Sequence, residues 1–172
     1  TLQTIPDNNY PFVQENADKA IKVAYLVLGE MCPDAEPERP YHSSQPKQHK
    51  KAIQRATTII DNNQIIVVSA VDYFREHEPF RMGQQTVYFD DNLAINVYPL
   101  GMALKEVRQK EKEESMEEKL RKLEVYFFDV GLDGHPDKIG LLGAPTPKHS
   151  FDQNLYLSTL DRIITKCEGA KQ

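Results

Sequence analysis

The segment from Val125 to Gly143, VYFFDVGLDGHPDKIGLLG, constrains the fold more than any other part of the sequence. Its two ends are short apolar runs of the kind that favours β-strands. Between them stand Asp-Gly and His-Pro, which are turn formers. The chain must therefore contain strands that reverse direction. The preferred interpretation is a plain antiparallel hairpin whose loop is solvated.

Three segments place apolar residues at helical spacing and are predicted to form amphipathic helices. The first spans roughly residues 12–31, and the second begins near Lys47. The third covers Asp152 to Cys167, where Asp152 stands in position to cap the helix start. Prolines punctuate residues 32–46, between the first two helices, so a long irregular loop is expected there. The second helix is defined by its apolar face, which consists of Ala52, Ile53, Ala56, Ile59 and Ile60.

Residues 64–74, QIIVVSAVDYF, are rich in β-branched side chains and follow a turn-like Asp-Asn-Asn. They predict a buried strand, with a helix as the alternative. Residues 85–90 and 93–98 flank Asp91-Asn92 at a spacing typical of an antiparallel hairpin. The expected fold is a single α/β domain of the α+β type over residues 1–172, in which three or four helices cover a small, mainly antiparallel sheet.

Charged residues dominate the segment from Lys105 to Glu124, where seven basic and seven acidic side chains fill 14 of 20 positions. Opposite charges recur four residues apart, an arrangement that stabilises helices. Apolar residues are missing from positions 108–115. One long charged helix is therefore predicted, with its middle projecting into solvent, and a disordered linker between two strands is the alternative.

The chain of 172 residues carries 26 acidic and 21 basic side chains, a formal net charge of -5. This balance argues against a nucleic acid or an anionic membrane as the partner. The longest dense apolar run, residues 64–74, is interrupted by Ser69 and Asp72. It is much shorter than the roughly 20 residues that a membrane-spanning helix needs. The sequence therefore predicts a soluble chain without such a helix.

The two cysteines, Cys32 and Cys167, lie far apart and form no CxxC or Cys/His cluster. Their simplest interpretation is two buried thiols. In a secreted chain they would instead form one long-range disulfide, provided that their Cα atoms came within about 7 Å. The compartment does not follow from the residues, because a chain beginning with Thr1 fits either removal of a leader or a shortened sequence.

The loop after the strand at Val125 carries carboxylates at every fourth position, namely Asp129, Asp133 and Asp137. Hard cations are held by several such oxygens that converge on one point. The stretch DVGLDGHPDKIGLLGAP resembles the calcium loop of FG-GAP repeats, which implies a site for a divalent cation, calcium or magnesium. Glycine occupies positions three and twelve, Gly131 and Gly140, so weak affinity is expected. The stretch occurs once, whereas FG-GAP propellers are built from repeated blades.

Two other groups of residues are candidates for function. Metal-dependent nucleases cluster carboxylates at strand ends, where predicted strands place Asp72, Asp90 and Asp129. Turn preference alone also explains aspartates at these positions. A basic group near the start of the second predicted helix is available to bind an acidic partner, although a solvated helix face is the simpler interpretation. Its members are Lys47, Lys50, Lys51 and Arg55.

The sequence contains no P-loop, GxGxxG or GxSxG motif, and its histidines are not paired at metal-ligand spacing. The residues therefore lean against an enzyme. The leading hypothesis is a non-catalytic domain that binds another protein or assists assembly, with the projecting charged helix as its contact surface. The alternatives are a divalent-metal protein using the 129–137 loop and a metal-dependent phosphodiesterase.

Overall fold

A five-stranded antiparallel sheet forms the centre of the computed structural model, which describes residues 3–5, 11–40, 52–73, 79–82, 85–88, 91–140, 147 and 149–169. Its strands run in the order β2-β3-β4-β7-β8, and each neighbouring pair is antiparallel. Together with four helices, this sheet confirms the predicted α+β class. The strands are β2 (Arg39–Pro40), β3 (Ala52–Asp61), β4 (Gln64–Tyr73), β7 (Asn92–Val97) and β8 (Val125–Val130).

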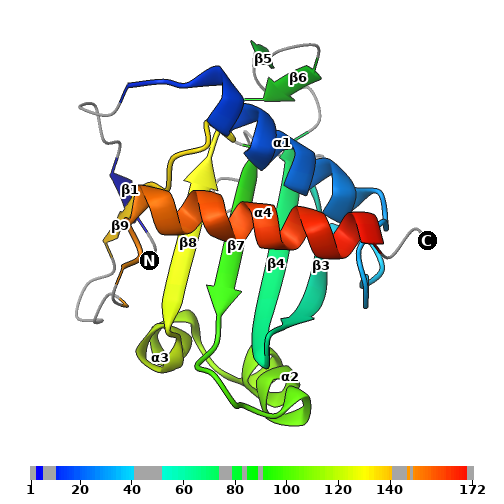
Figure 1. The fold of residues 1–172 in the computed structure, drawn as a ribbon, viewed down its shortest axis with the longest axis vertical. Coiled ribbons are helices and arrows are strands. Elements are labelled where there is room, and N and C mark those ends of the chain that lie inside the picture. The colour runs from blue at the N-terminus through cyan, green and yellow to red at the C-terminus, as the bar shows by residue number, and fades with distance from the viewer. Residues whose placement is uncertain are drawn as a thin grey trace.

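Two short antiparallel pairs lie beside the main sheet (Figure 1). The first joins β1 (Gln3–Ile5) to β9 (Lys138–Gly140). The second joins β5 (Pro79–Met82) to β6 (Gln85–Tyr88). The helices are α1 (Gln14–Leu28), α2 (Leu104–Glu113), α3 (Met116–Lys122) and α4 (Gln153–Gly169).

Helices α1 and α4 lie side by side across one face of the sheet, as Figure 1 shows. The alternation of side chains along each strand directs every second residue toward them. Residues of this kind on β4 are Ile66, Val68 and Ala70, and all are buried in the same core as the apolar faces of both helices. Outside this core, Lys19 of α1 and Asp161 of α4 form an ion pair at 3.1 Å.

The opposite face of the sheet is covered at one end by α2 and α3. Val107 of α2 and Leu120 of α3 pack with Tyr98 and Tyr126 in a second core. The charged segment is thus helical, but it forms two short helices that pack on the sheet instead of one long helix; the longest helix among the described residues is α4, with 17 residues. The break falls at Ser115, whose Oγ accepts a hydrogen bond from the Glu118 N–H. A helix start is stabilised by this type of cap.

The predicted helix beginning near Lys47 is wrong over the residues that the structure describes, because 52–61 form strand β3. The helical spacing of the apolar residues was coincidental. Strands β3 and β4 are joined by Asn62 and Asn63, with φ of 51° and 62°. Positive φ at both central residues is typical of the two-residue type I′ turn. The backbone twist of this turn matches the twist of the two strands that it joins. The β-branched run Thr-Thr-Ile-Ile followed by Asn-Asn was the signal for this hairpin.

Both predicted downstream hairpins are also wrong. Strand β6 pairs with β5 rather than with β7, and β7 lies between β4 and β8. Strand β9 pairs with β1 and not with β8, so the 131–137 loop connects two different sheets. Periodicity indicated most of these strands correctly, but pairing is a long-range property that the sequence pattern does not contain.

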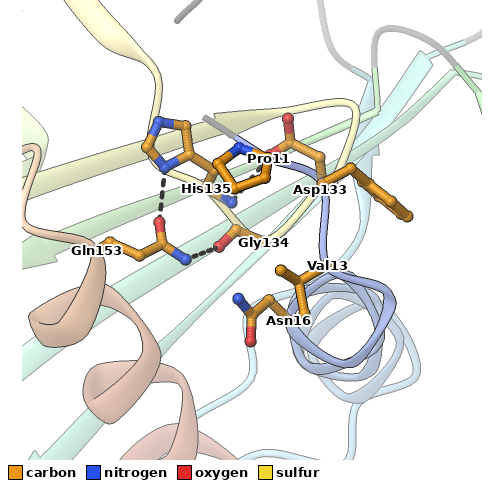
Figure 2. Close-up of a pocket in the computed structure, with 8 residues that line it drawn as sticks. Pro11, Val13, Asn16, Asp133, Gly134, His135 and Gln153 are labelled. Atoms are coloured by element: carbon orange, nitrogen blue, oxygen red, sulfur yellow. Dashed lines mark hydrogen bonds between the residues drawn. The ribbon is translucent and has the colours of Figure 1, made fainter. Parts of the chain in front are cut away.

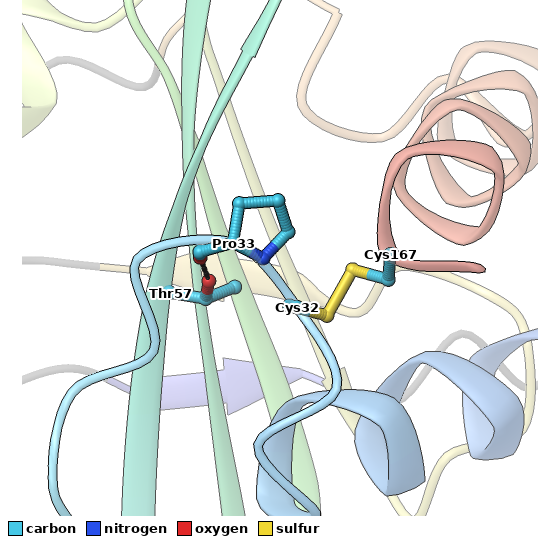
Figure 3. The surroundings of a disulfide bond; sticks show 4 residues. All are labelled: Cys32, Pro33, Thr57 and Cys167. Atoms are coloured by element: carbon cyan, nitrogen blue, oxygen red, sulfur yellow. Dashed lines mark hydrogen bonds between the residues drawn. A yellow bond between two sulfur atoms is a disulfide. The ribbon is translucent and has the colours of Figure 1, made fainter. Parts of the chain in front are cut away.

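Cys32 and Cys167 form a disulfide between the loop after α1 and the last turn of α4 (Figure 3), so the simpler prediction of two free thiols is wrong. Their Cα atoms are 4.2 Å apart, and both residues are buried. Beside the disulfide, the Thr57 hydroxyl donates to the Pro33 carbonyl. Within the described part of the chain, no helix is long and apolar enough to cross a bilayer.

We predict that replacing both cysteines by serine lowers the free energy of unfolding by about 2–5 kcal/mol. The disulfide closes a loop with a sequence separation of 135 residues. Its loss raises the conformational entropy of the unfolded chain and so favours unfolding. Urea denaturation of the double variant measures the effect. Wild-type protein under a thiol-free reductant serves as the control and should match the variant. Equal stability of oxidised and reduced wild type would contradict the prediction.

Candidate functional site

The loop of residues 131–137 lies where strand β8, the start of α1 and the start of α4 meet. Three of its residues have positive φ: Gly131 at 84°, Leu132 at 51° and Gly134 at 82°. Leu132 is buried in the main core, and the Gly131 N–H donates to the Asp91 carbonyl at 2.6 Å. Residues with a side chain, such as Leu132, rarely adopt positive φ. The loop keeps this conformation because the core and the Asp91 carbonyl hold it in place.

Asp129 is the centre of this arrangement and is completely buried, with 0% of its surface exposed. Its carboxyl accepts hydrogen bonds from the backbone N–H of Asp133 at 3.1 Å and of Gly134 at 3.0 Å. The hydroxyl of Tyr156 on α4 donates to the same carboxyl at 2.7 Å. Burial, and then the neighbouring charge of Asp133, raises the pKa of Asp129 well above its usual range, against the opposing effect of Tyr156. Asp129 therefore joins sheet, loop and helix.

Asp137 protects the outer edge of the sheet. Its Oδ2 accepts from the Val130 N–H at 2.7 Å, and its own N–H donates to the Phe128 carbonyl at 2.7 Å. Further along the same strand, the Ser150 hydroxyl accepts from the Tyr126 N–H at 3.3 Å. Side chains and loop backbone thus occupy positions where another strand would otherwise pair. Burial raises the pKa of Asp137 to about 6, although the Val130 hydrogen bond opposes the shift.

Asp133 and His135 of the loop and Gln153 of α4 are half-buried and form a polar network on the outer side of the loop. Asp133 Oδ1 accepts from the backbone N–H of His135 at 2.9 Å. Gln153 Nε2 donates to the Gly134 carbonyl at 2.8 Å, so its Oε1 faces His135 Nδ1 at 2.6 Å (Figure 2). Because an amide oxygen only accepts, the Nδ1 of His135 carries a proton. These contacts hold the imidazole in one orientation.

A small pocket opens beside this network, with a volume of about 60 Å³. Its apolar rim comes from the segment before α1, where the side chains of Phe12 and Val13 are 58% and 41% exposed. Figure 2 shows the polar lining residues, which come from α1, α4 and the loop. The described lining residues are Pro11, Phe12, Val13, Asn16, Asp133, Gly134, His135 and Gln153.

The three aspartates proposed as cation ligands lie close together, Asp129 near the end of β8 and the other two in the loop, but all three carboxyls serve the backbone. Asp129 and Asp137 accept hydrogen bonds from main-chain amides, and so does Asp133. Among the residues that the structure describes, no three His, Cys, Asp or Glu side chains are grouped so as to hold a metal ion. The calcium or magnesium site thus stays a prediction from sequence that the described geometry does not support.

Arg55, the one described member of the predicted basic group, does not lie on an exposed helix face. Arg55 lies on β3 and is only 8% exposed. Its guanidinium donates to the Leu28 carbonyl and is ion-paired with Glu30 at 3.0 Å and Glu38 at 3.7 Å. Arg55 therefore holds the end of α1 to the sheet. The remaining members of the group, Lys47, Lys50 and Lys51, lie outside the described residues.

The two described aspartates of the nuclease hypothesis, Asp72 and Asp129, do not lie together. Asp129 pairs with Leu93, which pairs with Ala70, and Asp72 lies two residues further along β4. Standard strand spacings put the Cα atoms of Asp72 and Asp129 about 12 Å apart. The Asp129 carboxyl accepts hydrogen bonds from two loop amides and Tyr156, whereas two-metal chemistry needs carboxylates that converge on cations about 4 Å apart. Asp90 lies outside the described residues.

Sequence reasoning missed three residues of this site: Tyr156, Gln153 and Phe12. Tyr156 was read only as an apolar member of the last helix, although a buried tyrosine needs a partner for its hydroxyl. Its partner, Asp129, is 27 residues away in the chain. No family model, curated protein or solved structure matches this chain.

Replacing Gly134 with alanine should destabilise the protein strongly. A Cβ at this position would lie 2.3 Å from the Asn16 carbonyl carbon. Gly101 has a similar φ of +88° but nothing within 4 Å of a Cβ, and it is the matched control. We expect a loss of about 1–2 kcal/mol for G101A from the left-handed conformation alone. G134A should lose about 1–3 kcal/mol more from the clash. Equal losses in urea denaturation would refute the close packing of loop and helix.

The contribution of Asp137 to the stability of the protein should fall as the pH rises from about 4 to about 6. A carboxyl with a higher pKa in the folded chain binds more protons when folded, so its contribution is present at low pH and is lost as pH rises through the folded value. Asp137 has such a pKa, about 6. D137N keeps an acceptor for Val130 but cannot ionise. Its melting temperature should change less over this range than that of wild type, and identical pH profiles would contradict the assignment.

Proposed function

We propose that the protein is a non-catalytic binding domain that recognises another protein through the surface around Phe12. This Phe12 surface consists of Pro11, Phe12 and Val13 with the adjoining pocket residues Asn16, Asp133, His135 and Gln153. The observation that carries the proposal is an exposed aromatic ring beside a polar pocket whose side chains are already held in place. Interfaces are commonly anchored by an aromatic residue next to well-ordered polar groups.

The groups beneath this surface act as a rigid support. Asp129 uses its oxygens on loop amides and on Tyr156, and Gln153 ties the loop to α4. The clash expected at Gly134 shows how closely the loop approaches α1. A binding surface that is ordered before the partner arrives loses less conformational entropy on association. The exposed Phe12 side chain is 58% accessible on top of this support.

The proposed surface differs from the one expected from sequence. The charged segment was expected to project and to contact the partner, but Val107 and Leu120 bury one side of it. Several of its charges are paired with each other, as in Lys119 with Glu111 at 2.9 Å and Lys122 with Glu114 at 2.6 Å. These ion pairs link α2 to α3. They support a structural role for this segment.

The test compares capture of partners by three forms of the protein. F12S/V13S removes the apolar rim, and L100S is the matched control because Leu100 is apolar and 71% exposed elsewhere. Cross-linking followed by mass spectrometry should recover a partner with wild type and L100S but at least about tenfold less with F12S/V13S, the loss of one interface anchor. Both variants replace exposed residues and should melt close to wild type. Equal recovery of the same partner by all three would refute the proposal.

A further inference from the structure

The size of the pocket beside Phe12 suits the head group of one side chain. Its volume is about 60 Å³. One bound water needs about 10–15 Å³ by this measure, so the space corresponds to about four to six waters. A guanidinium group has four heavy atoms, which is about the same size. The pocket is too small for a metabolite or a cofactor, which occupy sites of about 300 Å³ or more.

The charge around the pocket favours a cation. Among the lining residues that the structure describes, Asp133 supplies a carboxylate and none is lysine or arginine. Glu15, beside the lining residue Asn16, adds a second negative charge in the first turn of α1. The start of α1 contributes the opposite sign, equivalent to about half a charge. The full negative charge of the Asp133 carboxylate exceeds it, and Lys19, also on α1, is paired with Asp161.

The geometry of the polar and apolar groups fits a long basic side chain. Asp133 Oδ1 accepts one hydrogen bond, from the His135 N–H, and a carboxylate has about four acceptor positions. Capacity for a further donor therefore remains. Phe12 presents an exposed ring at the rim, and aromatic faces attract guanidinium groups. Pro11 and Val13 supply apolar surface for the methylene stem of such a residue.

We propose that this pocket receives a basic side chain of the protein partner, preferentially arginine, with Asp133 binding the guanidinium and Phe12 covering it. The inference rests on the proposed function and names the chemistry of the partner at that surface. Asp133 and Phe12 are the residues that set specificity. Gln153 is a positioning residue, because it holds the wall of the pocket through the Gly134 carbonyl, and His135 is another, because it holds Gln153 through the amide oxygen.

The experiment titrates isotope-labelled protein with N-acetyl-arginine methylamide and follows amide signals by NMR. Saturable shifts should appear at residues 12–16, 133–135 and 153. D133N keeps the acceptor for the His135 N–H but removes the charge, and should weaken binding about five-fold. F12L keeps apolar area but loses the ring, and should weaken it about three-fold. E117Q removes an equal charge from exposed Glu117 of α3 and should bind as wild type does.

N-acetyl-glutamine methylamide is the matched neutral probe and should cause at least about five-fold weaker shifts. Three outcomes would overturn the inference: no saturable shift with the arginine probe, equal shifts with the neutral probe, or equal affinity of D133N and wild type. None of these results depends on the partner. If the arginine probe fails while F12S/V13S still loses the captured partner, the proposed function stands and only the basic side chain is refuted. If F12S/V13S captures the partner as well as wild type does while the arginine probe binds the pocket, the proposed function fails instead.

Discussion

The hydrogen bonds to the buried carboxyl of Asp129 are the interaction on which the rest of the structure around the site depends. The carboxyl lies at the end of strand β8, receives two loop amides and meets the Tyr156 hydroxyl on α4. A buried carboxyl without partners costs several kcal/mol, so the chain must supply donors wherever this residue is placed. Those donors come from the loop and the helix. Satisfying Asp129 therefore also sets the loop conformation and the position of α4 relative to the sheet.

Several polar side chains in this protein bind backbone N–H and C=O groups that strand pairing and helix hydrogen bonds leave without partners. Asp137 occupies the open edge of β8, and Ser115 begins α3. Arg55 binds the carbonyl at the end of α1, where a helix exposes acceptors without donors. Carboxylates that resemble metal ligands in the sequence thus serve the main chain. On the outer side of the loop, Asp133 and Phe12 line the same small pocket.

Local physical chemistry accounts for what could be predicted from sequence. The helical spacing of apolar residues indicated α1 and α4, and Asp152 caps α4 through the Leu155 N–H at 3.1 Å, as predicted. The same reasoning failed at residues 52–61, because five apolar positions fit a helix by chance while the Thr-Thr-Ile-Ile run and the Asn-Asn turn belong to a hairpin. For the site, the loop and its three aspartates were found, but their hydrogen-bond partners were not.

The sequence by itself determined the fold class, the two helices of the main layer and the strands β4 and β8, because periodicity and turn residues act over a few neighbours. It also determined that the loop would be rich in carboxylates. Only the tertiary structure decided which strands pair, that Cys32 reaches Cys167, and that Asp129 meets Tyr156. The disulfide joins residues 135 positions apart, and the Asp129–Tyr156 hydrogen bond joins residues 27 apart. They form only when layers pack, since burial brings distant segments together and then requires each buried polar group to find a partner.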